Sequence, residues 1–100
     1  MIPYSFHPNA EAELSAAAEF YESRITGLGR LFSAEVQRTI SFIRDYPDAG
    51  AAIRLPVRRA LVDRFPYAII YRRDRELIHV LAVAHLRQRP NYWRQRQTAP

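Results

Sequence analysis

Residues 67–85, YAIIYRRDRELIHVLAVAH, decide the fold of this chain. β-Branched and aromatic residues run from Tyr67 to Arg73 and again from Leu77 to His85, and both runs have the length and composition of strands. Asp74-Arg75 lies between the runs, where a tight turn would join them into a hairpin. Strict alternation places Leu77, His79, Leu81, Val83 and His85 on one face of the second run, and Ile78, Val80, Ala82 and Ala84 on the other. Both faces are largely apolar, which predicts a central strand.

Two further strands are predicted outside this hairpin. A run from Val57 to Phe65 follows Pro56 and is again rich in β-branched and apolar residues. A short apolar segment from Ile2 to Phe6 has the character of an edge strand. Together the four segments predict a small, twisted antiparallel sheet with one face covered by helices.

The residues between the edge strand and the sheet predict two helices. In the first, apolar residues recur at helical spacing from residue 10 onward, with Pro8 favouring the start and Asn9 as the cap. Gly27 and Gly29 end this helix and allow a tight reversal. The apolar stripe of the second helix consists of Leu28, Phe32, Val36, Ile40 and Ile43, and Pro47 stops it. A short glycine loop predicts an antiparallel helical hairpin, and hairpin plus sheet give an α+β fold.

The composition is that of an ordinary globular domain. The 100 residues are 48% hydrophobic and 25% charged, so residues 1–100 are expected to form a single domain. The absence of cysteine excludes disulfides and Cys-based zinc sites. No apolar run approaches the ~20 residues that span a bilayer, and the N-terminal MIPYSFHPNAEAEL lacks the pattern of a signal peptide. We therefore expect a cytoplasmic protein that has no membrane contact and needs no cofactor or metal.

Positive charge is concentrated in the second half of the chain. Residues 51–100 hold 11 Arg and 3 acidic residues, a formal charge of +8, whereas residues 1–50 hold 4 Arg and 7 acidic residues, a formal charge of −3. Much of the charge falls in AVAHLRQRPNYWRQR, residues 82–96, which joins His85, Tyr92 and Trp93 to Arg87, Arg89, Arg94 and Arg96. A guanidinium group can donate two hydrogen bonds to the oxygens of one phosphate, and an aromatic face can stack on a base. This stretch therefore predicts a surface that binds a polyanion.

Four stretches in order resemble the RelE/ParE toxin superfamily of bacterial type II toxin–antitoxin systems. They are FHPNAEAEL, YESRITGLGRLFSAEV, RFPYAIIYR and AVAHLRQRPNYWRQR, and the resemblance covers nearly the whole chain. It implies a helical hairpin on a compact antiparallel sheet. It also implies a toxin neutralised by a cognate antitoxin, which wraps an amphipathic segment over apolar grooves, so we expect a toxin–antitoxin hetero-oligomer.

The superfamily implies two classes of target. The RelE-like branch is a metal-independent endoribonuclease that cuts mRNA in the ribosome, and the ParE-like branch poisons DNA gyrase. RNA cleavage without a metal needs a base, an acid, and cations around the phosphorane. Arginine does not exchange protons near neutrality, which leaves His85, or Tyr92 if the surrounding arginines lower its pKa.

The resemblance also implies roles for individual residues. Arg87 falls where RelE-like members keep a phosphate-stabilising arginine, Arg59 falls among their basic residues, and Tyr92 or Trp93 lies near their C-terminal tyrosine. The candidate catalytic residues are therefore His85, Arg87, Tyr92 and Arg59. The candidate target-contacting residues are Arg89, Trp93, Arg94 and Arg96.

One departure from the RelE-like pattern favours the ParE-like branch. Ribonucleolytic members carry an arginine directly after the aromatic residue that opens the middle strand, whereas here Ala68 follows Tyr67. Pro66 makes the segment FPY, which is more similar to the ParE-like branch. The resemblance to that branch implies that the residues from about His85 onward act on gyrase.

Several assignments have structural alternatives. His85 at a strand end suits a structural histidine as well as a catalytic one, and Trp93 suits an anchor on the sheet as well as a stacking platform. Four acidic residues have helical rather than catalytic spacing and are read as solvated surface: Glu11, Glu13, Glu19 and Glu22. A third functional hypothesis, outside the family, is a small nucleic-acid-binding domain without toxicity.

Overall fold

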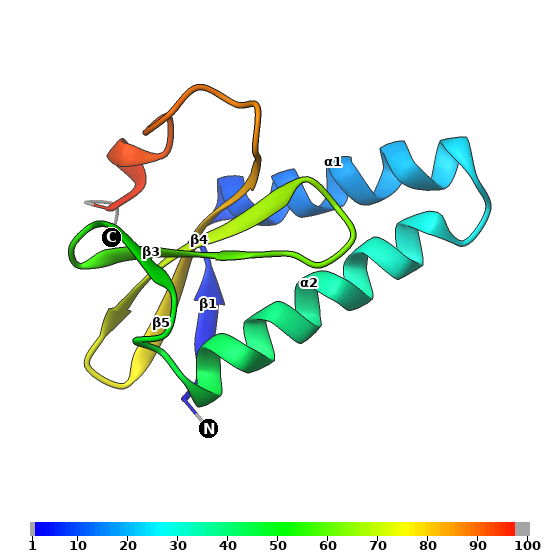
Figure 1. The fold of residues 1–100 in the computed structure, drawn as a ribbon. Helices are drawn as coiled ribbons and strands as arrows, with labels where there is room; N and C mark the ends of the chain where they lie inside the picture. Colours follow the sequence, from blue (N-terminus) through cyan, green and yellow to red (C-terminus); the bar gives the residue numbers. More distant parts are fainter. Residues whose placement is uncertain (1, 98–100) are drawn as a thin grey trace.

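The computed structural model describes residues 2–97, which form a helical hairpin against one face of a five-stranded sheet (Figure 1). The strand order is β1-β5-β4-β3-β2. The elements are β1 (Tyr4–Phe6), α1 (Pro8–Arg24), α2 (Leu28–Asp45), β2 (Ala51–Arg54), β3 (Val57–Leu61), β4 (Tyr67–Asp74), β5 (Leu77–His85) and the 3-10 turn η1 (Arg94–Gln97). The predicted α+β class is confirmed. None of the helices in residues 2–97 is long and apolar enough to cross a membrane.

The sheet is mixed rather than wholly antiparallel. Strands β3, β4 and β5 pair antiparallel as predicted, and β2 adds a further antiparallel strand beside β3. Strand β1 lies at the edge and runs parallel to β5, with Tyr4 opposite Ile78 and Phe6 opposite Val80. The apolar pattern of residues 2–6 indicated an edge strand but carried no information on its direction. Strand β2 was not predicted. All four of its residues are exposed, and its sequence shows no alternation of apolar and polar side chains.

The helical hairpin begins and turns one or two residues away from the predicted positions. His7, not Asn9, is the cap of α1, and its Nδ1 accepts a hydrogen bond from the backbone N–H of Asn9 at 3.0 Å. The reason is that Pro8 already occupies the first helical turn. Gly27 turns the chain with φ of 90°. Gly29 lies inside α2 rather than in the loop, and a side chain there would meet the backbone oxygen of Ala18 on α1.

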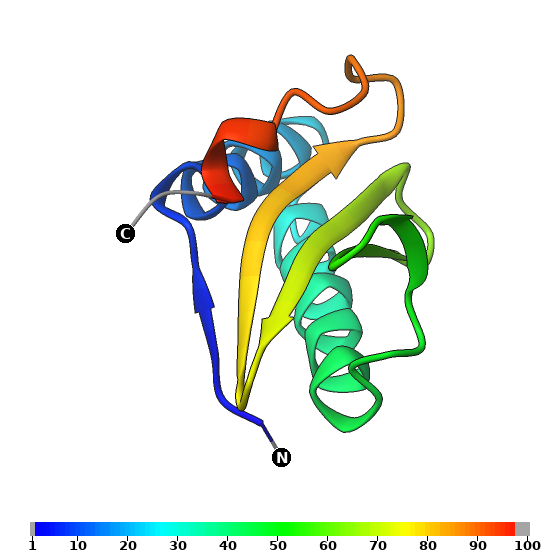
Figure 2. The same ribbon diagram turned by 90° about the vertical axis from the view of Figure 1, so that its left-hand side faces the viewer.

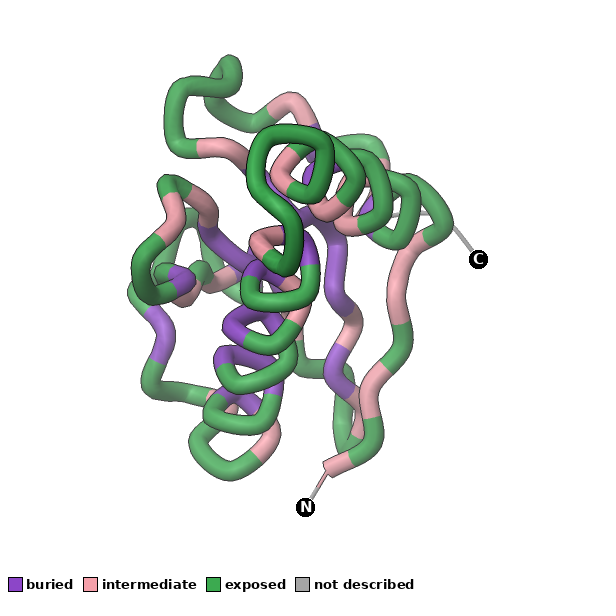
Figure 3. The backbone as a smooth tube through the Cα atoms, turned by 90° about the vertical axis from the view of Figure 1, so that its right-hand side faces the viewer, coloured by how far each residue is buried: buried purple, intermediate pink, exposed green. Residues whose placement is uncertain are grey.

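The core lies between the hairpin and the sheet face that it covers, here called the helix face. Figure 3 shows buried residues gathered where α2 meets the sheet, while the tip of the hairpin is exposed. The predicted stripe of α2 is confirmed in this core, apart from half-buried Leu28. The fully buried members are Phe32, Val36, Ile40, Ile43, Ile69, Ile78, Val80 and Val83, and Tyr71 joins them.

A β-bulge in β5 overturns the predicted alternation of that strand. Ile70 pairs with Ala82, but the next residue of β4, Tyr71, pairs with Val80, so Leu81 is an extra residue. Such a residue reverses the side-chain alternation beyond it. Val83 therefore joins Val80 on the helix face, while Ala82 lies on the other face. The hairpin turn is also one residue later than predicted, because Asp74 still pairs with Leu77.

The opposite side of the sheet, here called the open face, carries a smaller apolar cluster. Its members are Val57, Ala68, Ile70, Leu81, Ala82, Ala84 and Trp93. Trp93 comes from the segment after β5, which returns over this face before η1. Figure 2 shows η1 beside the first part of α1. The end of the described chain is thus anchored both on the sheet and near the first helix.

Replacement of Tyr71 by Phe should destabilise the fold. Tyr71 is 1% exposed, and its hydroxyl donates to the Pro47 carbonyl at 2.9 Å and accepts from the Gly50 N–H at 3.1 Å. Burial raises the pKa of Tyr71, so this hydroxyl keeps its proton. Loss of the hydroxyl leaves two backbone groups unpaired, and the free energy of unfolding should fall by about 1–3 kcal/mol in a urea titration. Tyr46→Phe is the control, because Tyr46 is 61% exposed. Equal losses in both variants would contradict this account of the loop after α2.

Candidate functional site

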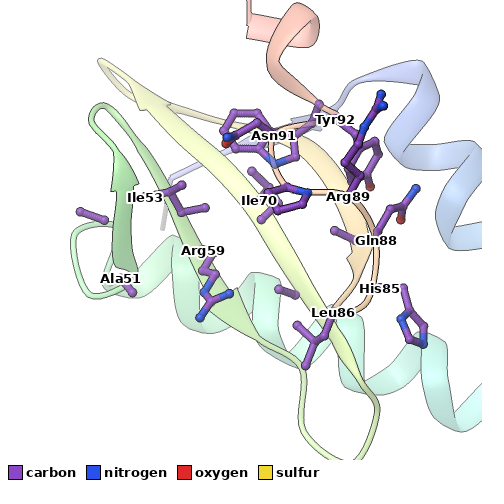
Figure 4. A pocket seen from close by; sticks show the side chains of 15 residues that line it. Ala51, Ile53, Arg59, Ile70, His85, Leu86, Gln88, Arg89, Asn91 and Tyr92 are labelled. Carbon is purple, nitrogen blue, oxygen red and sulfur yellow. The ribbon is translucent and has the colours of Figure 1, made fainter.

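A groove of about 380 Å³ lies on the open face, beneath the residues that follow β5 (Figure 4). Its apolar floor consists of Ala68, Ile70 and Ala84. Residues 51–53 and Arg59 line it on the side of β2 and β3. Residues 86–93, here called the C-terminal loop, line the other side, and all of them except Arg87 contribute to the lining. This groove contains most of the residues that the sequence assigned to a site.

Arg59 and His85 reach the groove from opposite sides of it. Arg59 pairs with Ile70 and lies on the open face. His85 pairs with Tyr67, and its ring meets the Tyr67 ring edge-on with centroids 5.1 Å apart. Tyr67 packs against the core of the helix face, so the imidazole points toward the helices. In Figure 4 Leu86 lies between Arg59 and His85. The structure therefore does not bring these two candidate catalytic residues together.

His85 holds the start of the C-terminal loop. Its Nδ1 accepts a hydrogen bond from the backbone N–H of Arg87 at 3.0 Å, and its carbonyl accepts one from the Gln88 N–H at 3.0 Å. The Leu86 N–H donates to the Pro66 carbonyl at 2.9 Å. With Nδ1 acting as an acceptor, the neutral ring carries its proton on Nε2. These contacts are those of a structural histidine at a strand end.

Tyr92 is bound to a carboxylate that the sequence analysis read as solvated. Its hydroxyl donates to Glu13 Oε2 at 2.9 Å, and Arg96 donates to both oxygens of the same carboxylate at 3.0 Å. The side chains of Arg96 and Glu13 are only 13% and 21% exposed. Burial, then the hydrogen bond to the Glu13 carboxylate and its charge, raise the pKa of Tyr92. The condition for Tyr92 to act as a base, a lowered pKa, is not met.

Trp93 and Arg96 are held inside the molecule rather than presented at its surface. Trp93 is 3% exposed and packs in the apolar cluster of the open face, which agrees with the anchor interpretation. Arg96 also donates to the Leu81 carbonyl at 3.0 Å and lies over the Tyr92 ring at 5.0 Å. Both side chains are engaged in intramolecular contacts. Their placement does not support the predicted role in contacting a target.

The remaining candidate arginines are exposed. Arg59, Arg87, Arg89 and Arg94 all lie at the surface, and within residues 2–97 none of them forms an ion pair with an acidic side chain. Arg59 and Arg89 line the groove itself. The groove thus has an apolar floor and a cationic rim, which suits binding of an acidic surface or a phosphate.

Two contributors to the site were missed from the sequence. Residues 51–53 line the groove from a strand with no recognisable pattern. Glu13 was missed although a signal existed, since it falls three residues after Ala10 and four before Ala17. Both alanines are buried, so this spacing places Glu13 on the inward face of α1. An acidic residue on that face requires a partner.

Comparisons with known proteins give a family match and a structure of similar fold. The family model described as the ParE toxin of the type II toxin-antitoxin system, parDE, matches residues 4–90. A solved chain from the chromosomal ParDE TA system of P. aeruginosa has a similar fold, with a TM-score of 0.68 and 19% sequence identity, over 85% of this chain and 96% of that chain. No curated protein matches the sequence. The chain therefore belongs to the ParE toxins of type II toxin–antitoxin systems, the branch that the FPY segment and Ala68 favoured.

Proposed function

We propose that this protein inhibits growth by poisoning DNA gyrase, and that a cognate antitoxin neutralises it. Gyrase is the target implied by the ParE-like resemblance, and membership of the ParE family supports it. The observation that carries the proposal is that both candidate proton-transfer groups border the groove but are engaged in contacts elsewhere, His85 with Tyr67 and the Arg87 backbone and Tyr92 with Glu13. A binding surface fits this arrangement better than a ribonuclease site.

A metal-independent nuclease needs side chains that transfer protons at the reacting atoms. A general base or acid must reach the reacting atoms within hydrogen-bond distance, directly or through one water. His85 faces Tyr67 and binds the Arg87 backbone, and Tyr92 is bound to Glu13. Arginine side chains supply charge but no proton exchange. Within residues 2–97, both candidate acid–base groups are therefore engaged in contacts other than with the cations of the groove.

Ala68 adds an independent argument. It is buried in the floor of the groove, at the position where ribonucleolytic members of the superfamily carry an arginine. An arginine there would project from the open face toward any phosphate bound above it, since its neighbour Ile70 lines the same groove. Alanine instead leaves the floor apolar. An apolar floor with charged edges is typical of protein–protein contact.

A second groove supports neutralisation by an antitoxin. A hollow of about 490 Å³ lies between α2 and the end of β3, and exposed Phe42 and Leu61 contribute to its lining. The charged residues of the lining are Glu35, Arg38, Arg59 and Asp63, and Arg38 is paired with Glu35. The whole chain has a formal charge of +5. An acidic, amphipathic segment would bury the apolar groups and pair with Arg59, which forms no ion pair within residues 2–97. Such a segment is the kind of antitoxin that the resemblance implies.

The purified protein should inhibit supercoiling by DNA gyrase and should leave ribosome-bound mRNA intact. Induction in bacteria should arrest growth with DNA damage and filamentation, and co-expression of the protein encoded next door should relieve the arrest. Arrest with cleaved transcripts and unaffected gyrase would support the RelE-like alternative. A chain that arrests nothing but binds nucleic acid with a steep salt dependence would support the third hypothesis.

His85→Asn and His85→Ala separate a structural from a catalytic histidine. An Asn side chain readily accepts a hydrogen bond from the backbone N–H two residues on, so it should replace the contact to Arg87. We expect His85→Asn to keep most of the gyrase inhibition and His85→Ala to weaken it. A general acid or base would instead lose about 10²-fold or more in both variants. Equal and large losses would contradict the structural role.

A further inference from the structure

We propose that Glu13 is a positioning residue that holds the C-terminal loop in the conformation that meets the target. The assignment of this loop to target contact rests on the proposed function. The assignment of Glu13 to the loop rests on geometry alone. Glu13 does not line the groove and acts through Tyr92, which does.

The Glu13 carboxylate accepts four hydrogen bonds from two separate parts of the chain. Oε1 accepts from the Val83 N–H of β5 and from Arg96 Nη1, each at 3.0 Å. Oε2 accepts from the Tyr92 hydroxyl at 2.9 Å and from Arg96 Nη2 at 3.0 Å. A carboxylate offers about four lone-pair positions, so its hydrogen-bonding capacity is filled by the protein itself. One side chain of α1 therefore joins the first helix, the sheet and the end of the described chain.

The Glu13 and Arg96 side chains complete an edge of the sheet where a strand is missing. The pairing of β1 with β5 ends at Phe6 opposite Val80, because the chain then enters α1. Beyond that point the Val83 N–H bonds to Glu13 and the Leu81 carbonyl bonds to Arg96. The Leu81 carbonyl belongs to the bulge residue itself, and the Val83 N–H lies two residues after it. The side chains thus satisfy backbone groups that a longer edge strand would otherwise pair.

The same contacts restrict the C-terminal loop at both of its ends. His85 holds the start of the loop through the Arg87 N–H. Glu13 holds its end through Tyr92, and Trp93 is buried directly after it. Arg89 lies between these fixed points and lines the groove. Fixing both ends reduces the conformations that the exposed arginines can adopt, which lowers the entropy lost on binding.

Glu13→Gln tests the proposal, with Glu19→Gln as the matched control because Glu19 is exposed on the same helix. Glutamine has nearly the same shape, but it leaves Arg96 without its charge partner and replaces one acceptor oxygen by an NH2 group, which is a donor facing other donors. Loss of a hydrogen bond to a charged group changes an equilibrium constant by about tenfold or more. We therefore expect the equilibrium constant for opening of the loop to rise by about tenfold or more in Glu13→Gln.

Tryptophan fluorescence and tryptic cleavage both report on the conformation of the loop. Trp93 is the single tryptophan of the chain, so its emission reports whether the anchor stays buried. In Glu13→Gln we expect a red-shifted emission, stronger quenching by acrylamide, and faster tryptic cleavage after Arg87. The far-ultraviolet circular dichroism should stay that of the wild type. Arg96→Gln removes the partner instead and should give the same signature, which provides a second variant if Glu13→Gln does not fold.

The functional readout is growth arrest on induction, which does not depend on the identity of the target. Glu13→Gln should lose arrest at expression levels where Glu19→Gln keeps it, while binding of the antitoxin is retained. An unchanged Trp93 emission in both Glu13→Gln and Arg96→Gln would overturn the proposal. Full arrest despite a mobile loop would also overturn it. If the wild-type chain arrests growth without inhibiting gyrase, gyrase is not the target. Growth arrest by the variants still tests the role of Glu13 in that case.

Discussion

The packing of the α2 apolar stripe against β3 and β4 is the contact that organises the rest of the molecule. Phe32, Ile40 and Ile43 are fully buried there, and each such side chain contributes about 1.5–3 kcal/mol relative to exposure. This contact decides which face of the sheet is covered by helices. It leaves the other face to the residues after β5, and Trp93 covers part of it. The groove exists because the helices occupy only one side.

The position of each functional side chain follows from that division. Arg59 opposite Ile70 faces the groove, whereas His85 opposite Tyr67 faces the helices. Because β1 ends at Phe6, the outer edge of β5 beyond Val80 is left to Glu13 and Arg96, and these two side chains hold the end of the loop. The result is a site in which exposed arginines lie above an apolar floor, and such a site is suited to binding. The conformation of the loop that lines it depends on contacts outside the groove.

Much of the fold could be predicted from the sequence, because its strongest signals are periodic. The α2 stripe and the β4–β5 hairpin come from apolar patterns that continue over several helical turns or along whole strands, and the short apolar run at residues 2–6 indicated the edge position of β1. The direction of β1, the bulge and β2 could not be predicted in this way. Each depends on contacts between distant segments, and a bulge shifts the alternation on which strand prediction relies.

The candidate site was less accessible to sequence reasoning. The proximity of cations and aromatics in residues 82–96 correctly pointed to this part of the molecule, but adjacency along the chain does not indicate orientation. Tyr92, Trp93 and Arg96 turn inward because Glu13 and the apolar cluster provide partners for them. An acidic residue 79 positions earlier in the chain decides this, as the contact between Glu13 and Tyr92 shows.

Hydrogen–deuterium exchange of this protein with and without gyrase shows whether the groove and its cationic rim bind the target. We predict that gyrase slows exchange in residues 51–53 and 88–91, which line the groove, and leaves exchange at the hairpin tip, residues 23–27, unchanged. Protection at the hairpin tip, with none at the groove, would contradict it.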